Sequence, residues 1–401
     1  MALPLSGYFD CCATTPLAEE VRLAMQTAER EAWANPSSLH GFGLAAAESL
    51  ERDRQRLAAL LGADPDSLLF TSGGTESIHL ALRGSAAVLE RHMGRPGRVL
   101  ISAVEHPASV AAAEQLRQRG WDVVQIPVDR CGVLDLEALE ALLKPPTSLV
   151  SVIWGQSEVG TLQPLSAIGE RCRDAGVLLH VDAVQVVGHL PVRFRDLPVD
   201  LLSLAAHKCQ GPRGIGALLV RPGIELDPLL SGGGQEGGLR AGTESVVLVH
   251  GFATAVELSE RCLQSHAGCD PVAALRNRLA SLLLEDGQLG ATIEITGPDP
   301  WQEQRLPQHL SVVVRDDQQQ PLSGRRLVQA MARLGFAVSS GSACSSGSQR
   351  PSAVLLALGF NPADAAGGLR ISLGPWHTDA MLAALVHGLR QARQELLRHD
   401  L

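Results

Sequence analysis

The sequence is short of aromatic residues and of positive charge. Aromatic residues make up 3% of the 401 residues, and there is a single tyrosine. Proteins that bind single-stranded nucleic acid use exposed aromatic rings as stacking platforms, and these are scarce here. Lys and Arg number 34 against 43 Asp and Glu, which gives a formal net charge of −9 at pH 7. General nucleic-acid binders carry the opposite sign, so no nucleic-acid partner is expected.

Long apolar runs and regularly spaced cysteines are missing as well. The longest apolar stretches, such as 177–181 and 217–220, have the length of a strand and not of a membrane span. The N-terminal residues include no basic segment, so neither a secretory signal nor a membrane partner is expected. The eight cysteines form no Cys-x-x-Cys pair, which argues against a zinc site and a disulfide framework. This cysteine usage favours a cytoplasmic protein without a metal site.

Short apolar segments alternate with amphipathic ones between about residues 60 and 220. This pattern predicts an α/β fold whose mostly parallel sheet is covered by helices on both faces. Ligands of such sheets bind at the carboxyl ends of the strands. Strands are expected at 68–71, 99–102, 122–126, 149–153, 177–181, 201–204 and 215–220, and helices at 76–89, 107–118, 135–142 and 165–175.

The C-terminal part of the chain has a different pattern, which predicts a smaller α+β domain. Its strands are expected at 291–296, 309–314 and 368–372, and its helices at 270–285, 322–334 and 378–397 after a helix at 243–264. The predicted large domain spans residues 16–260. The predicted small domain combines residues 1–15 with residues 261–401.

Chemically distinctive residues follow three of the predicted strands. Gly73 and Gly74 open a helix and could cradle a phosphate, although a glycine-rich turn capped by Thr75 explains them too. Asp182 ends a buried strand, where it could pair with a protonated heterocyclic nitrogen or cap the next helix. Lys208 could be desolvated into a Schiff-base nucleophile or lie in a surface turn. Together these groups match what pyridoxal phosphate needs.

Three further features lie later in the chain. The small, polar segment 339–347 holds Cys344, which could deliver an exposed thiolate or be an incidental surface thiol. The glycine-rich loop 232–243 could close over a phosphate or reach a neighbouring subunit. Arg370 could clamp a carboxylate with its guanidinium, although an edge-strand arginine is the alternative.

A series of motifs occurs in order along the chain, namely Phe9–Pro16, Asn35–His40, Phe70–Ser77, Glu105–Pro107, His180–Asp182, His207–Lys208, Gly232–Thr243 and Ser339–Ser346. In these motifs the sequence resembles the NifS/IscS-like cysteine desulfurases of the class V aminotransferase family. The resemblance covers nearly the whole chain. It implies a fold type I pyridoxal-phosphate-dependent transferase with a seven-stranded sheet in its large domain, active as a cytoplasmic homodimer.

The resemblance also implies roles for individual residues. Lys208 would carry pyridoxal phosphate and, with His106, move protons, while Asp182 would pair with the pyridinium nitrogen. Taken alone, Gln185 and His106 have ordinary structural explanations; in the family, Gln185 would bond the phenolic oxygen and His106 would stack on the ring. The remaining roles are phosphate binding by Gly74, Thr75 and His207, binding of the partner subunit's phosphate by Thr243, substrate binding by Arg370 and Asn35, and acceptance of sulfur by Cys344 as a persulfide.

Three positions depart from the family pattern. Ser157 replaces an asparagine that contacts cofactor and substrate, and Ala205 stands where a phosphate-binding serine is usual. Gly237 stands where an arginine usually follows Gln-Glu. These changes predict weaker binding of cofactor or substrate and not a loss of chemistry.

The implied activity converts L-cysteine into L-alanine and transfers the sulfur to an acceptor protein, for example an iron–sulfur scaffold. A cysteine or cystine C–S lyase, or a selenocysteine lyase, is an alternative on the same fold, and the presence of Cys344 disfavours a lyase. A cofactor-binding scaffold with little turnover is a second alternative. The retained Lys208, Asp182 and His106 argue against it.

Overall fold

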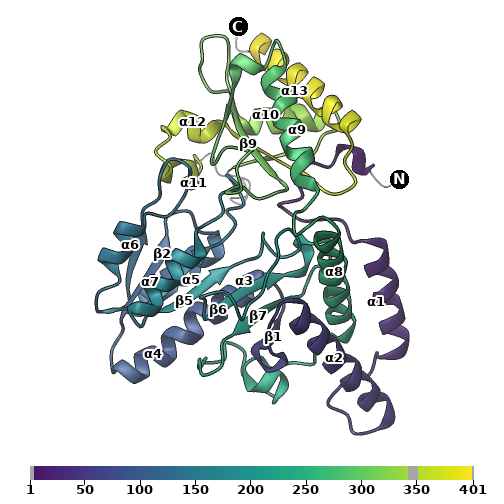
Figure 1. The fold of residues 1–401 in the computed structure, drawn as a ribbon, viewed down its shortest axis with the longest axis vertical. Coiled ribbons are helices and arrows are strands. Elements are labelled where there is room, and N and C mark those ends of the chain that lie inside the picture. Colours follow the sequence, from purple (N-terminus) through teal and green to yellow (C-terminus); the bar gives the residue numbers. More distant parts are fainter. Residues whose placement is uncertain (1–3, 342–350, 400–401) are drawn as a thin grey trace.

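The computed structural model describes residues 4–341 and 351–399. It contains a larger sheet flanked by helices and, above it in Figure 1, a smaller sheet with helices of its own. Among the described residues, no helix is long and apolar enough to pass through a membrane.

The larger sheet has seven strands in the order β1-β7-β6-β5-β4-β2-β3. Its strands are parallel except β7, which runs antiparallel to both β1 and β6. Every strand predicted for this sheet is present, and the ends differ from the predicted ones by two residues or fewer. The bounds are β1 Leu68–Thr71, β2 Arg98–Ser102, β3 Asp122–Ile126, β4 Thr147–Ile153, β5 Leu178–Asp182, β6 Leu201–Ala205 and β7 Gly216–Val220.

Helices cover both faces of the larger sheet because successive strand side chains point to opposite faces. Leu218 packs with α3, α4 and α5 on one face, whereas its neighbour Leu219 packs with α1, α2, α6, α7 and α8 on the other. The helix predicted at 76–89 is α3, a π-helical turn at Leu80–Gly84 and α4 in succession. The bounds are α1 Glu19–Glu31, α2 Gly41–Leu60, α3 Gly74–His79, α4 Ser85–Met93, α5 Pro107–Gln118, α6 Leu136–Leu142, α7 Leu165–Asp174 and α8 Val246–Ser265.

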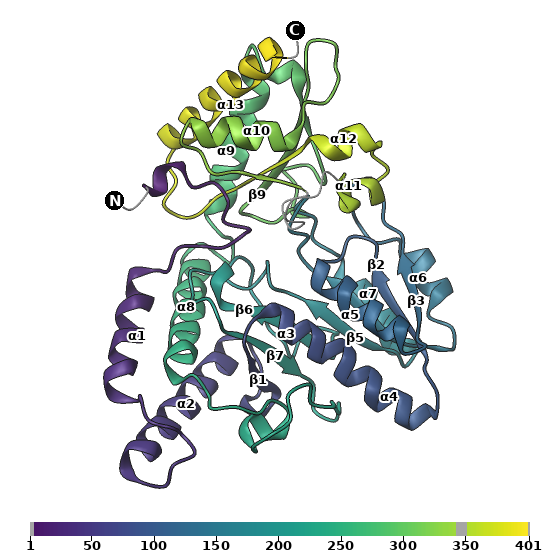
Figure 2. The ribbon, with the colours of Figure 1, turned by 180° about the vertical axis from the view of Figure 1, so that it is seen from behind.

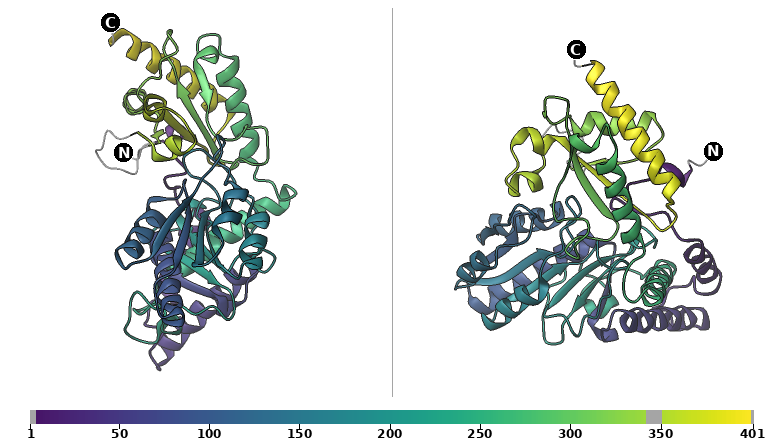
Figure 3. Two further views of the ribbon diagram at one scale, coloured as in Figure 1. Left: turned by 90° about the vertical axis from the view of Figure 1, so that its left-hand side faces the viewer. Right: turned by 45° about the horizontal axis from the view of Figure 1, so that its top comes forward.

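The smaller sheet has four antiparallel strands in the order β10-β11-β9-β8. Helices α9, α10 and α13 pack against it around a separate apolar core. This part of the molecule lies at the top of both views in Figure 3. The bounds are β8 Ile293–Ile295, β9 His309–Val314, β10 Ser339–Ser340, β11 Gly368–Ser372, α9 Val272–Glu285, α10 Gly324–Arg333, α11 Ala353–Ala357, α12 Pro362–Gly367 and α13 Asp379–His399.

The N-terminal segment connects the two parts of the molecule, as Figure 2 shows in purple. Phe9 is fully buried in the core of the smaller part, and Asp10 forms a bridge with Ser372 at the end of β11. Five residues later, Thr15 hydrogen-bonds to the carbonyl of His207 beyond β6. The segment therefore runs from one sheet to the other. The division at residue 260 stays a prediction, and α8 continues through that position.

Candidate active site

Lys208 lies just beyond β6, at the end of a short 3-10 helix over Ala206–Lys208. Its amine donates hydrogen bonds to two carbonyls of the N-terminal segment, those of Cys12 at 2.6 Å and Ala13 at 2.8 Å. The charge of Lys208 also acts on the pKa of Asp182 and of His106. The predicted cofactor lysine, Lys208, therefore lies near the predicted acid, Asp182, and the predicted stacking histidine, His106.

Asp182 is the last residue of β5 and is 3% exposed. Its Oδ1 accepts the backbone N–H of Val184 at 2.9 Å, so the carboxylate closes a turn and does not cap a helix. Burial raises the pKa of Asp182 to about 6, against the opposing effects of the Val184 N–H and the charge of Lys208. A protonated ring nitrogen would stabilise the buried negative charge.

Gln185 follows Asp182 in the same turn and is buried. Its side-chain amide donates to the carbonyl of Cys12 at 2.8 Å, the same oxygen that receives the amine of Lys208. Gln308, the residue just before β9, donates to the backbone carbonyl of Gln185 at 3.0 Å. One carbonyl of the N-terminal segment therefore holds two of the predicted cofactor residues in place.

The predicted phosphate cradle lies where β1 leads into α3. A Cβ on Gly74 would stand 2.7 Å from Cγ2 of Val184, so only glycine lets the helix begin this close to the end of β5. Gly73, and not Thr75, occupies the N-cap position of α3. The N–H groups of the first helical turn, including that of Thr75, have no partner within the helix and suit an anion. Ala205 faces Gly74 with a methyl group and offers no hydroxyl.

His106 and His207 are both neutral rings at neutral pH. Burial and the charge of Lys208 lower the pKa of each to about 4, with Arg213 contributing at His207. His106 caps α5 by accepting the N–H of Ala108 at its Nδ1, so its ring proton resides on Nε2. His207 contacts the hydroxyl of Thr14 at 3.1 Å.

Arg370 enters the site from the other sheet, on β11, and is 8% exposed. Its guanidinium donates to the carboxylate of Asp10 at 2.8 Å and to the backbone carbonyl of Ser157 at 3.0 Å. Ser157 thus contributes to this site through its main chain. A guanidinium held from two sides is suited to binding a carboxylate in a fixed orientation.

Two buried acids belong to the same region and were not singled out from the sequence. Glu158 accepts a hydrogen bond from the hydroxyl of Ser352, and a Cβ on Gly341 would stand 2.1 Å from its carboxylate. Burial raises the pKa of Glu158 to about 7, although Ser352 and Arg370 oppose the shift. Burial raises the pKa of Glu105 to about 8. A glutamate directly beside predicted site residues was the available signal for both.

Two predicted site residues lie apart from this group. Asn35 is exposed between α1 and α2, where its side chain accepts the N–H of Ser37 at 2.9 Å. Helix α1 separates it from the N-terminal segment, and a helix of that length spans about 20 Å. Thr243 is exposed and lines a cavity of 150 Å³ together with Ser72 and Arg240. Cys344 lies outside the described residues.

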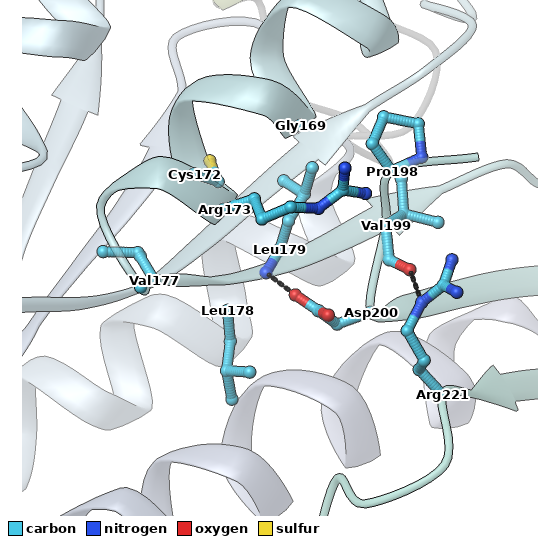
Figure 4. Close-up of a pocket in the computed structure, with 11 residues that line it drawn as sticks. Gly169, Cys172, Arg173, Val177, Leu178, Leu179, Pro198, Val199, Asp200 and Arg221 are labelled. Atoms are coloured by element: carbon cyan, nitrogen blue, oxygen red, sulfur yellow. Dashed lines mark hydrogen bonds between the residues drawn. The ribbon is translucent and has the colours of Figure 1, made fainter. Parts of the chain in front are cut away.

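A larger cavity, of 390 Å³, contains none of the predicted site residues. It lies where β5 begins, at the end of the strand opposite Asp182, and Figure 4 shows it. There Asp200 accepts the N–H of Leu179, and Arg221 donates to the carbonyl of Val199. This cavity therefore lies at the edge of the sheet opposite the predicted site residues. Among the described residues, no group of three or more His, Cys, Asp or Glu side chains is placed to hold a metal ion.

The residues at the carboxyl edge fit pyridoxal phosphate. An amine, a buried carboxylate and an amide donor lie together at Lys208, Asp182 and Gln185, beside a neutral imidazole. The start of α3 offers N–H groups beside the end of β5, where Gly74 allows the helix to pack closely against Val184. The polar groups at this edge therefore have the chemistry that the polar groups of the cofactor require.

Comparisons with known proteins agree with this fit. A family model described as "Aminotransferase class-V" matches residues 7–385. The "Cysteine desulfurase" of Cereibacter sphaeroides is 41% identical over 388 residues, covering 95% of this chain and 94% of that protein. The "Cysteine desulfurase IscS" of Dictyoglomus turgidum is 36% identical over 371 residues, covering 92% and 90%.

Solved structures show the same similarity in three dimensions. A structure named "NIFS-LIKE PROTEIN" superposes with a TM-score of 0.87 at 33% identity, covering 99% of this chain and all of that one. A structure named "SspA in complex with cysteine" has a TM-score of 0.79 at 30% identity, covering 93% and 100%.

Proposed function

Because this chain belongs to the class V aminotransferase family, whose members use pyridoxal phosphate, we propose that it is a cysteine desulfurase. Such an enzyme converts L-cysteine into L-alanine and transfers the sulfur to one of its own cysteines. One observation carries the proposal. Lys208, Asp182 and Gln185 lie together at the carboxyl edge of the larger sheet, and Arg370, held by Asp10, enters the same site.

When bound, pyridoxal phosphate supplies an electron sink for negative charge at the α-carbon of an attached amino acid. Asp182 would hold the ring nitrogen, because its buried carboxylate is stabilised by a positive partner. Gln185 would hold the phenolic oxygen with the side-chain amide that bonds Cys12 in this structure. Lys208 would hold the cofactor with its amine, and the same amine would accept or donate a proton at the α-carbon of the substrate.

Arg370 and Cys344 act on the two other ends of the substrate. Arg370 binds the α-carboxylate and is itself oriented by Asp10 and Ser157. The thiolate of Cys344 attacks the substrate sulfur, so that a sulfur–sulfur bond forms and the bond from sulfur to the β-carbon breaks. The β-carbon keeps the electron pair and takes up a proton. The products are alanine and a persulfide on Cys344.

A homodimer completes this proposal. Asn35 follows the end of α1, whereas Lys208 contacts the N-terminal segment before that helix, so we infer that Asn35 serves the partner subunit. Around it, Trp33, Leu39 and Phe42 are 64%, 90% and 67% exposed, an apolar surface of the kind that mates with another protein. Thr243 is exposed on a loop that a second copy could meet. We expect the protein to act in the cytoplasm and to pass its sulfur to an acceptor protein.

Incubation with L-cysteine tests the proposal when alanine, pyruvate and sulfide are measured together. We expect alanine, with one persulfide on Cys344 before any acceptor is added, and no pyruvate. Pyruvate and ammonia would instead identify a C–S lyase, and the absence of any product would favour a scaffold. The relatives are named for desulfuration, and neither alternative is favoured by them.

Cys344→Ala is the decisive variant. It should retain the absorption band of the bound cofactor and lose alanine formation by several orders of magnitude, because no other nucleophile is assigned to the sulfur. Alanine formation at the parent rate would refute the role of Cys344. Cys262→Ala is the matched control: this cysteine is half-buried on α8 and has no role in the proposed reaction.

A further inference from the structure

Glu105 lies between the end of β2 and the start of α5, immediately before His106. Its side chain is 6% exposed. One carboxyl oxygen, Oε1, accepts a hydrogen bond from the hydroxyl of Ser102 and another from the backbone N–H of Ile153, both at 2.6 Å. This oxygen joins the ends of β2 and β4 at the edge of the sheet where the cofactor residues gather.

The second oxygen of Glu105 has a different environment. Oε2 is buried and has no hydrogen-bond acceptor or donor assigned to it among the described residues, and the same holds for the hydroxyl of Ser109. Ser109 faces the carboxyl group from the first turn of α5, and its hydroxyl lowers the pKa of Glu105, although burial and Asp182 outweigh that effect. A proton on Oε2 would let this oxygen donate to the hydroxyl of Ser109, which would give both atoms a hydrogen-bond partner.

The charged neighbour of Glu105 is Asp182, at the end of β5. Two carboxylates buried close together in a low-dielectric setting do not both ionise readily. Burial and the negative charge of Asp182 both raise the pKa of Glu105, to about 8. Lys208 favours the charged form of Asp182, whose pKa is the lower of the two, at about 6. The proton of the pair therefore belongs to Glu105.

We propose that Glu105 is a positioning residue that stands as a neutral acid beside Asp182, tying β2, β4 and α5 together while leaving the negative charge to Asp182. The groups that face it are Ser102 on β2, Ile153 on β4, Asp182 on β5 and Ser109 on α5. An ionised Glu105 would push a proton onto Asp182 and would weaken its pairing with the cofactor ring. The significance for catalysis rests on the proposed function, whereas the protonation state does not.

Glu105→Gln tests the protonation state in the cofactor-free protein. The glutamine carbonyl can accept from Ser102 and Ile153, and its NH₂ group can donate to Ser109, as the neutral acid does. In the parent, a carboxyl whose folded pKa is raised loses stability as the pH rises from its unfolded value of about 4.5 to about 8. The difference in melting temperature between Glu105→Gln and the parent should therefore rise in favour of the variant across this window. Above about pH 8 the difference should stay constant.

Glu114→Gln is the matched control, since Glu114 lies exposed on the same helix. Its melting temperature should show no comparable gain with pH. A Glu105→Gln difference that is flat or falls with rising pH would mean that Glu105 is ionised in the folded protein, and would overturn the proposal.

Cofactor binding tests the positioning role. Apo-Glu105→Gln should bind pyridoxal phosphate within about threefold of the parent, whereas Glu105→Ala, which removes both contacts of Oε1, should bind it at least tenfold more weakly. A tenfold loss in Glu105→Gln would show that the charge is needed and would overturn the proposal. If the parent forms no alanine from cysteine, the proposed function fails, and the melting and binding measurements still decide the state of Glu105.

Discussion

Asp182→Asn should raise the stability of the cofactor-free protein and weaken its binding of pyridoxal phosphate. Asparagine keeps the size of the side chain and can keep the acceptor for the N–H of Val184, which bonds Oδ1 at 2.9 Å. It removes the charge from a side chain that is 3% exposed. The substitution therefore separates the cost of burying this carboxylate from the benefit of its pairing with the cofactor.

The size of the first effect follows from the pKa. Burial raises the pKa of Asp182 from its usual 3.8 to about 6. One pKa unit corresponds to about 1.4 kcal/mol, so the ionised carboxylate costs about 3 kcal/mol of folding free energy above pH 6. The raised pKa means that this stability is present below about pH 4 and is lost as the pH rises toward 6. Asp182→Asn should recover up to that amount at neutral pH and none of it at pH 4.

The second effect has the opposite sign. A hydrogen bond to a charged group contributes about 1.5–3 kcal/mol, so its loss should weaken binding of pyridoxal phosphate by about 10- to 150-fold. Melting curves of the apoprotein from pH 4 to pH 8 measure the first effect, and titration of the apoprotein with the cofactor measures the second. An apo-Asp182→Asn that gains nothing between pH 4 and pH 8, or that binds the cofactor as the parent does, would refute this account.

Three more predictions concern other parts of the molecule. Borohydride reduction of the loaded protein should place the cofactor on Lys208 by peptide mass spectrometry, and an adduct on another lysine would contradict the assignment. Sedimentation at micromolar concentration should show a dimer that Phe42→Asp disrupts, because that side chain is 67% exposed in the apolar surface around Asn35; an unchanged sedimentation coefficient would count against this interface. Arg54→Ala should lower the free energy of unfolding by about 3–5 kcal/mol in denaturant titrations, because it leaves the buried Glu236 carboxylate without the guanidinium that contacts it at 2.5 Å. A loss below about 1 kcal/mol would show that solvent replaces the arginine.

The strands of the larger sheet could be predicted from the sequence because each is a short apolar run with little competition from other structure. The expected strand over 122–126 matches β3 to the residue. Helices α1 and α2 were not predicted. Helix α2 mixes alanine and charged residues with only a weak apolar stripe. Both helices pack against α8, a segment far along the chain that the local sequence does not indicate.

The candidate site was predictable to the extent that its residues follow strands. Asp182 ends β5 and Lys208 follows the end of the neighbouring parallel strand β6, so the topology of a parallel sheet places them together. The pairing of Arg370 with Asp10 was not predictable, because it depends on how the smaller sheet sits on the larger one. The neutral state of Glu105 was hidden for a similar reason, since it follows from the approach of three strand ends and not from the residues next to it in the chain.

The N-terminal segment has a consequence for the order in which the chain can mature. Asp10 and Cys12 are made early in synthesis, yet their partners Arg370 and Ser372 each lie 360 residues further along the chain. A contact of that sequence separation closes late, after more local structure has formed. Truncated or nascent chains that stop before residue 370 lack the guanidinium that Asp10 orients and the hydroxyl that receives the N–H of Cys12. Asp10 must meet Arg370 before the guanidinium is oriented for a carboxylate, so a chain that stops earlier should be unable to hold cysteine in a reactive position.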